Sequence, residues 1–186
     1  MPYSQHLQHA TQTLFSGGVI AYPTEAVWGL GCDPHNRHAV EKLLAMKQRP
    51  AHKGLILVAA NIDQFQPYLQ GLSEHLLAQL NQAWPGPRTF IVPDNGFAPS
   101  LVRGDHHGVA LRVSQHPSII SLCHHFGGPI VSTSANRSRL PAAKWPWQIR
   151  KQWPKQLDYL LPGTLGSANK PSQIIDLVSG TILRPA

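Results

Sequence analysis

The sequence of 186 residues has few cysteines and few charged side chains. Its two cysteines, Cys32 and Cys123, form no CxxC pattern, so we expect neither a disulfide framework nor a zinc site. Charged residues make up 13% of the chain, and acids are the scarcer kind, with 9 Asp and Glu against 16 Lys and Arg. The resulting net charge of +7 favours anionic partners, either nucleic acid or phosphate-bearing small molecules.

Long apolar runs and the familiar phosphate-binding motifs are also absent. The longest apolar run, residues 55–60, is far too short to cross a membrane, and the N-terminus lacks the apolar core of a signal peptide. We therefore expect a soluble cytoplasmic protein. There is no GxxxxGK[ST] loop, no GxGxxG fingerprint, no HExxH and no GxSxG. The eleven histidines show no ligand spacing, so we expect no metal ligands from the protein.

What remains is an alternation of short apolar runs and amphipathic segments. The runs predict buried strands, and the segments between them predict helices, notably at residues 6–15, 36–47 and 117–126. In the strand predicted at 108–114, Val109, Leu111 and Val113 face one way while Ala110 and Arg112 face the other. The pattern indicates an α/β fold: one domain over residues 1–186, with a twisted, open, mixed sheet flanked by helices.

Two of the predicted strands lead into side chains that carry hydroxyl groups. Residues 19–22 run into Pro23 and Thr24, and residues 129–131 run into Ser132. Ligands bind at the carboxyl ends of strands in open α/β sheets, so these hydroxyls are candidates for one site. The competing interpretation of each hydroxyl is a cap or a turn. Hydroxyls together with cations make a cradle for a polyphosphate or a carboxylate, and the candidate cations are Lys47, Arg49, Lys53 and Arg112.

Taken together, six stretches resemble the YrdC/TsaC family, the threonylcarbamoyl-AMP synthases, in their short bacterial form. They follow the order of the family over nearly the whole chain: AYPTEAVWGLGCDP, KQRP followed by KGLIL, WPGPRTF, LRV at 111–113, PIVSTSAN and PSQIID. Two stretches depart from the family. Residues Arg137-Ser138-Arg139 stand where STSAN usually continues to Ser-Gly, and the strand LILVAA lacks a histidine that helps some relatives to bind threonine.

The resemblance implies a YrdC-like fold and a reaction in which L-threonine, bicarbonate and ATP give L-threonylcarbamoyl-AMP and pyrophosphate. The product would serve the N6-threonylcarbamoyl modification of adenosine 37 in tRNAs that read codons beginning with A. Mg²⁺ is expected with ATP, and proteins that transfer the group to tRNA are expected as partners. Two alternatives are a basic module that binds double-stranded RNA or tRNA without catalysis, and a carbamoyl-transfer relative of the domain in hydrogenase maturation proteins.

The resemblance also implies roles for individual residues. Lys47 and Arg49 are the expected catalytic residues, in contact with the phosphates of ATP and the carbamate. Threonine and its carbamate are expected to meet Thr24, Arg112 and Ser132. The remaining nucleotide contacts are expected from Lys53, Thr89, Ser134, Asn136 and Ser172, together with Lys47 and Arg49. The reaction gives Glu25 no necessary role, and we expect it to be structural or to support a residue that contacts the substrate.

Overall fold

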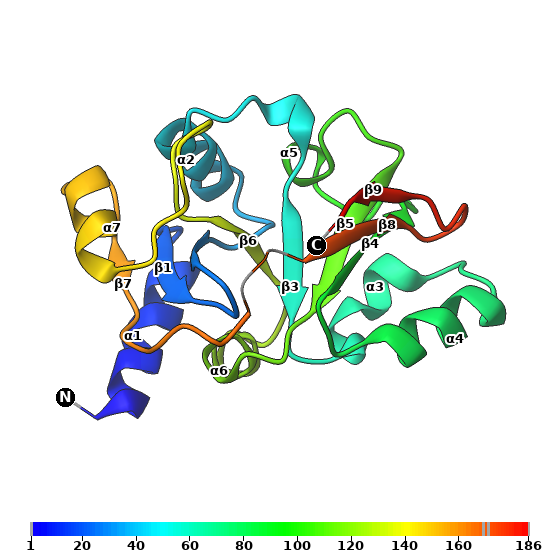
Figure 1. Ribbon diagram of the computed structural model, residues 1–186, viewed down its shortest axis with the longest axis horizontal. Helices are drawn as coiled ribbons and strands as arrows, with labels where there is room; N and C mark the ends of the chain where they lie inside the picture. The colour runs from blue at the N-terminus through cyan, green and yellow to red at the C-terminus, as the bar shows by residue number, and fades with distance from the viewer. Residues whose placement is uncertain (1, 169, 171, 186) are drawn as a thin grey trace.

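A single mixed sheet runs through the computed structural model, which describes residues 2–168, 170 and 172–185 (Figure 1). Pro171 of the PSQIID stretch lies outside these residues. Within them the strands are β1 (Ile20–Pro23), β2 (Trp28–Gly31), β3 (Ile56–Ala59), β4 (Arg88–Pro93), β5 (Gly108–Val113), β6 (Ile130–Ser134), β7 (Tyr159–Leu160), β8 (Gln173–Asp176) and β9 (Ile182–Arg184). Their order is β7-β1-β2-β6-β3-β5-β4-β8-β9. The pairs β1/β7, β3/β5 and β4/β8 are parallel and the others are antiparallel, which confirms the predicted mixed sheet.

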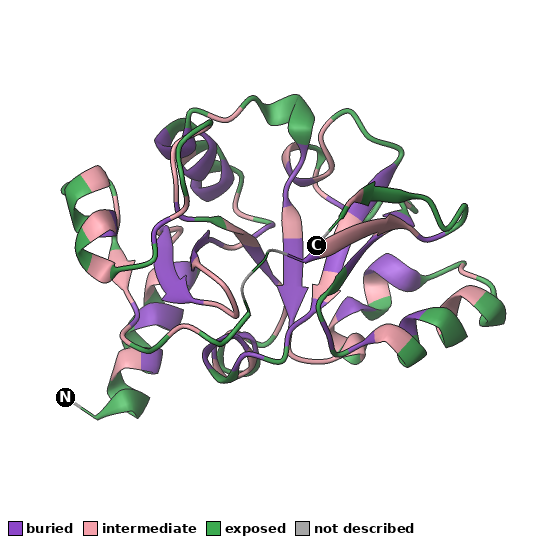
Figure 2. Ribbon diagram, in the orientation of Figure 1, coloured by how far each residue is buried: buried purple, intermediate pink, exposed green. Residues whose placement is uncertain are grey.

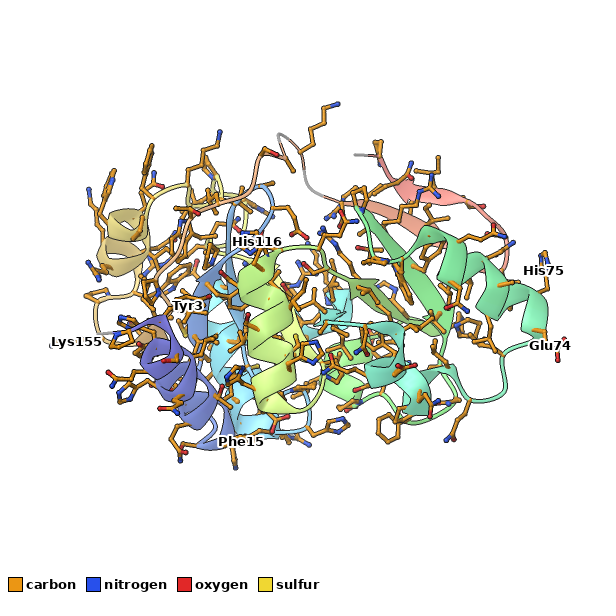
Figure 3. All side chains as sticks on the ribbon, turned by 90° about the horizontal axis from the view of Figure 1, so that it is seen from below. Tyr3, Phe15, Glu74, His75, His116 and Lys155 are labelled. Carbon is orange, nitrogen blue, oxygen red and sulfur yellow. The ribbon has the colours of Figure 1, made fainter. Side chains whose placement is uncertain are left out.

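Helices cover both faces of this sheet. They are α1 (Tyr3–Phe15), α2 (Arg37–Lys47), α3 (Gln66–Leu69), α4 (Glu74–Ala83), α5 (Ser100–Arg103), α6 (Pro117–Phe126) and α7 (Pro146–Gln152), with short 3₁₀ helices η1 (Ala51–Lys53) and η2 (Ile62–Phe65). Helices α1 and α6 lie side by side on one face (Figure 3), where Tyr3 Oη donates to Ser118 Oγ at 3.0 Å. No helix in the described part of the chain is long and apolar enough to cross a membrane.

The sheet separates two apolar cores. In β1, Ile20 and Tyr22 belong to the core under α1 and α6, whereas Ala21 belongs to the larger core on the opposite side. The same alternation holds in β6, where Ile130 and Val131 enter different cores. Because side chains of a strand point alternately to its two faces, a strand buried on both faces reads as an unbroken apolar run. Figure 2 shows the resulting buried centre of the sheet.

Most predicted elements are present, and two features of the strands bear on the site. Strand β2 forms although two of its four residues are glycines, because its backbone pairs with both β1 and β6. A Cβ on Gly31 would lie 2.8 Å from Cε1 of Tyr22, so this glycine serves the packing of the strand. Strand β6 continues through Ser134, pairing Ser132 with Ile56 and Ser134 with Gly29. The hydroxyls of residues 132–134 are therefore held by the sheet itself.

Arg139 occupies the position where the resemblance leads us to expect glycine. Its backbone has a φ of 68°, in the left-handed region that costs a residue with a side chain about 1 kcal/mol or more. We expect Arg139→Gly to raise the free energy of unfolding by about 0.5–1 kcal/mol, measured by urea denaturation, because glycine adopts this conformation without a steric penalty. Arg139→Ala is the control, and it should bring no gain. A loss of stability in Arg139→Gly would contradict the argument.

Candidate active site

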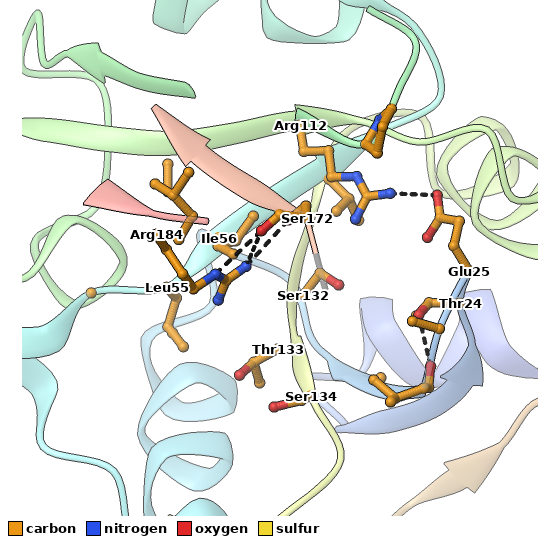
Figure 4. Close-up of a pocket in the computed structure, with 18 of the residues that line it drawn as sticks. Thr24, Glu25, Leu55, Ile56, Arg112, Ser132, Thr133, Ser134, Ser172 and Arg184 are labelled. Carbon is orange, nitrogen blue, oxygen red and sulfur yellow. Dashed lines mark hydrogen bonds and ion pairs between the residues drawn. The ribbon is translucent and has the colours of Figure 1, made fainter. Parts of the chain in front are cut away.

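A pocket of about 1210 Å³ opens over the turn between β1 and β2 and over the strands β3, β5 and β6 (Figure 4). The β8–β9 hairpin and residues 166–168 complete its wall. Ligand pockets commonly measure about 300–1,000 Å³. This pocket therefore has room for more than one small substrate at a time.

The pocket is strongly cationic. Six of the described residues that line it carry a permanent positive charge: Arg49, Lys53, Arg103, Arg112, Lys170 and Arg184. The acids in the described lining are Glu25 and Asp176. The Asp176 carboxylate accepts hydrogen bonds from the backbone N–H groups of Val178 and Ser179, so it stabilises its own turn. Such a lining suits a ligand with several negative charges.

Three of the four arginines among these cations come from distant parts of the chain. Arg49 follows α2, Arg112 lies on β5 and Arg184 lies on β9. Arg49 donates from Nε and Nη2 to Gly54 O at 3.1 and 2.8 Å, and Arg184 Nη2 donates to Ser172 O at 2.6 Å. Since a guanidinium has five N–H donors, these bonds fix its plane while using only some of the donors. Burial, followed by the charges of Arg112 and Arg49, lowers the pKa of Arg184.

Lys47 lies behind the pocket wall rather than in it. Its side chain is buried at the end of α2, and Nζ donates to Ser134 O, to Asn136 O at 2.9 Å and to Asn136 Oδ1 at 3.4 Å. Burial, with a smaller effect of Arg49, lowers the pKa of Lys47 to about 7. Lys47 therefore anchors the segment that follows β6.

Asn136 is also turned toward its own segment. Its Nδ2 donates to Leu140 O at 2.6 Å, while its Oδ1 accepts from Ser134 Oγ at 2.6 Å. Ser132 and Ser134 line the pocket. The side chains of Lys47 and Asn136 thus hold Ser134 where it faces the cavity.

Thr89 supports Ser172 in the way that Lys47 and Asn136 support Ser134. The Thr89 side chain is fully buried, and its hydroxyl lies 2.8 Å from the hydroxyl of Ser172, which lines the pocket. Nη2 of Arg184 lies 3.3 Å from the same Ser172 hydroxyl. Thr89 and Arg184 together fix the position of Ser172.

The opposite end of the pocket is built by Thr24, Glu25 and Arg112. Thr24 Oγ1 donates to Val27 O at 2.7 Å, in the tight turn between β1 and β2. Arg112 Nη2 lies 2.8 Å from Glu25 Oε1, and its Nε donates to Gly86 O at 3.2 Å. Arg112 and Ala110 do face the pocket from β5, as the alternation of that strand predicts.

The structure thus brings most of the predicted site residues to one cavity. Seven line it: Thr24, Arg49, Lys53, Arg112, Ser132, Ser134 and Ser172. Lys47, Thr89 and Asn136 are each hydrogen-bonded to a residue of that group but do not line the cavity. The sequence prediction missed Arg103, Lys170 and Arg184, and it gave Glu25 a structural or supporting role. The sequence held one indication of Arg184, since this cation stands at the end of a short apolar strand.

The model of the Sua5/YciO/YrdC family, described as telomere recombination, matches residues 12–186. The chain belongs to this family. Among members with curated names, the threonylcarbamoyl-AMP synthase of Saccharophagus degradans is 51% identical over 178 residues, which are 96% of this chain and 93% of that protein. The threonylcarbamoyl-AMP synthase of Pseudomonas aeruginosa is 50% identical over 179 residues, 96% of each chain. The predicted family is therefore confirmed.

Solved structures of the Sua5/YciO/YrdC family have the same fold. The P. abyssi Sua5 complexed with L-threonine superposes with a TM-score of 0.90 at 26% identity, over all of this chain and 55% of that one. The chain thus spans just over half the length of that relative. E. coli YciO superposes with a TM-score of 0.84 at 25% identity, over 98% of this chain and 89% of the other.

Proposed function

We propose that this protein is an L-threonylcarbamoyladenylate synthase. The amine of L-threonine and bicarbonate give a carbamate and water, and a carbamate oxygen then attacks the α-phosphorus of ATP, releasing pyrophosphate. The observation that carries the proposal is the convergence of Arg49, Arg112 and Arg184 on one cavity large enough for a nucleotide and an amino acid. Near-full-length relatives at about half identity carry that name.

The reaction requires cations and oriented hydrogen-bond donors from the protein. Two anionic substrates must meet at close range, so the main barrier is their repulsion and their alignment. Arginines held by backbone carbonyls satisfy this need, because they need little reorganisation when the anions bind. No group of the chain has to act as an acid or a base on the attacking carbamate oxygen, which is already negative.

The nucleotide fits the end of the pocket that Arg49, Lys53, Ser134, Ser172 and Arg184 line. Arg49 and Arg184 are placed to meet the phosphates, as is the ammonium of Lys53 on η1. Apolar side chains from three neighbouring strands line the same end and offer a surface for the adenine base: Ile91, Ile174 and Leu183.

L-Threonine fits the opposite end, beside Thr24, Arg112 and Ser132. Arg112 would bind the amino-acid carboxylate with the donors that Gly86 and Glu25 leave unused. The hydroxyls of Thr24 and Ser132 would contact the rest of the substrate. We assign Lys47, Thr89 and Asn136 a supporting role, since each acts on the pocket through Ser134 or Ser172. A direct contact of Lys47 with phosphate requires Nζ to leave its carbonyl partners.

Mg²⁺ would enter this site with ATP. In the described part of the chain, no group of three or more His, Cys, Asp or Glu side chains could hold a metal ion. The ion would therefore be held mainly by phosphate oxygens and water, as is common for Mg²⁺ with nucleotides, and it would reduce the negative charge of the phosphates. We further propose that residues 1–186 act as one YrdC-like domain in the cytoplasm and that the product passes to the proteins that modify tRNA.

One set of measurements tests the proposed synthase activity against the alternative of an RNA-binding module. The protein is incubated with ATP, Mg²⁺, bicarbonate and labelled L-threonine, and pyrophosphate and the labelled adenylate are measured. We expect both products only when threonine is present. Failure under conditions where the P. aeruginosa relative forms product would reject the enzyme. RNA binding that falls steeply with salt, without any product, would favour the basic RNA-binding module instead.

A further inference from the structure

The pocket is uneven in charge, and Glu25 is the cause. The wall near Arg49 and Arg184 is cationic, whereas at the other end the carboxylate of Glu25 pairs with Arg112. An acid inside a pocket for anionic substrates weakens their binding, because it removes most of the local positive potential. Its presence beside the one arginine that faces Thr24 and Ser132 therefore needs an explanation (Figure 4).

The surroundings hold Glu25 firmly in this place. Oε1 accepts from Ser114 Oγ at 2.7 Å and lies 2.8 Å from Arg112 Nη2. The backbone carbonyl of Glu25 accepts from the N–H of Ala168 at 3.0 Å. The side chains of Glu25 and Arg112 are 20% and 15% exposed, so solvent screens the pair only in part.

The carboxylate also keeps unused capacity to accept hydrogen bonds. Oε2 is buried and has no hydrogen-bond partner among the described residues, although Oε1 has two. A buried acceptor without a donor costs free energy, and such groups tend to persist at functional sites. Because Oε2 is buried, a ligand with an N–H group beside its carboxylate would supply that donor after a small shift of the Glu25 side chain toward the cavity, while the ligand carboxylate binds Arg112.

We propose that Glu25 makes the Arg112 end of the pocket selective for a zwitterionic amino acid and excludes polyphosphate from it. Arg112 alone would attract phosphate as readily as carboxylate. With Glu25 beside it, the local charge is nearly balanced, so a polyanion gains little there and is directed to Arg49 and Arg184. An α-amino acid carries its ammonium group two bonds from its carboxylate carbon, and it is complementary to an arginine and a carboxylate in contact.

This inference rests on the proposed function, and binding measurements without turnover separate the two. Calorimetry without bicarbonate compares L-threonine with (R)-3-hydroxybutyrate, the same molecule without its amino group, on the wild-type protein. We expect the analogue to bind at least about tenfold more weakly, because it leaves the Glu25 carboxylate without a donor. We expect inorganic tripolyphosphate to leave the dissociation constant of L-threonine nearly unchanged.

The variant Glu25→Gln removes the charge and keeps the size of the side chain. It should reduce the preference for L-threonine over (R)-3-hydroxybutyrate about tenfold. Tripolyphosphate should now compete with L-threonine, raising its apparent dissociation constant about tenfold. Asp176→Asn is the matched control, since it removes the same charge from the other end of the pocket. It should leave both the preference and the competition as in the wild type.

Several results would overturn the proposal. Equal binding of L-threonine and (R)-3-hydroxybutyrate by the wild type would do so even if Glu25→Gln failed to fold. So would competition by tripolyphosphate in the wild type, or a folded Glu25→Gln variant that keeps the wild-type preference. If the wild type binds no L-threonine and makes no adenylate, the proposed function fails first. If it makes the adenylate but shows no preference, only the role of Glu25 fails.

Discussion

Arg112→Ala is expected to raise the dissociation constant of L-threonine about 100-fold while changing that of ATP less than about threefold. The guanidinium lines the pocket together with Thr24, Glu25 and Ser132 in the proposed threonine end, and it pairs with Glu25. Charge-assisted hydrogen bonds to a carboxylate are worth about 1.5–3 kcal/mol. Removing Arg112 also leaves the Glu25 carboxylate without its ion-pair partner, so its negative charge repels the carboxylate of the substrate.

Two further variants sharpen this prediction. Arg112→Lys keeps the charge but loses the planar fork that Gly86 and Glu25 hold, so we expect a weakening of about tenfold. Arg103→Ala removes a different pocket cation, one paired with Asp94 at 3.1 Å, and should leave threonine binding almost unchanged. Titration calorimetry gives all the constants. If Arg112→Ala weakened ATP and L-threonine equally, the carboxylate contact would be refuted.

Lys47→Met is expected to reduce the rate of adenylate synthesis by a factor of about 100 or more while the protein stays folded. Methionine matches the length and burial of the lysine stem, but it cannot donate to the carbonyl oxygens of Ser134 and Asn136. Each carbonyl left without a donor costs about 1–3 kcal/mol, and the segment can recover this only by moving. Movement of Ser134 would misplace the part of the pocket assigned to phosphate.

Lys42→Met is the matched control for this variant. Lys42 lies on the same helix, but it faces outward and pairs with Asp158 at 2.6 Å. Its loss should leave the rate close to that of the wild type. Circular dichroism checks that both variants keep their helices. Full activity in folded Lys47→Met would show that the anchoring of the segment is not needed.

Lys47 should also make stability depend on pH. Its pKa falls from 10.5 to about 7 on folding, so between these values the unfolded chain binds more protons than the folded one. Stability therefore rises with pH across this window, and the cost of burying the charged ammonium is complete below about pH 7. At about 1.4 kcal/mol per pKa unit, we expect a rise on the order of 2–4 kcal/mol by about pH 9.5.

Urea unfolding of the wild type and of Lys47→Met at several pH values measures this effect. Other groups titrate alike in both proteins, so the difference between the two curves isolates Lys47. The curve of the wild type should be the steeper one. Parallel curves would mean that the carbonyl oxygens of Ser134 and Asn136 keep the ammonium charged despite its burial.

Local patterns in the sequence were enough to predict the fold class and most of the elements. Helix α6 has the predicted bounds, and Asn36 caps α2 by accepting from the N–H of Ala39, as expected for a residue of this type at that position. The alternation in β5 placed Arg112 on the pocket side. Helix periodicity puts Lys47 on the buried side of α2, but it does not show that Nζ meets backbone carbonyl oxygens.

Other features were beyond local reasoning because they depend on strand order. Residues 28–31 carry two glycines and one strong apolar pair, a poor strand signal, yet β2 forms because β1 and β6 supply partners on both sides. Backbone pairing with distant segments here outweighs the local preference.

The sequence by itself determined which side chains are available, which face of each element is polar, and, through the order of its motifs, the family. The tertiary structure alone decided which of these side chains meet. Glu25 and Ser114 are 89 residues apart and share a hydrogen bond, and Thr89 reaches Ser172 over 83 residues. Arg184 joins the site because β9 pairs with β8, which pairs with β4. Such contacts follow from the order of strands in a sheet, and burial is a property of that whole arrangement rather than of any one segment.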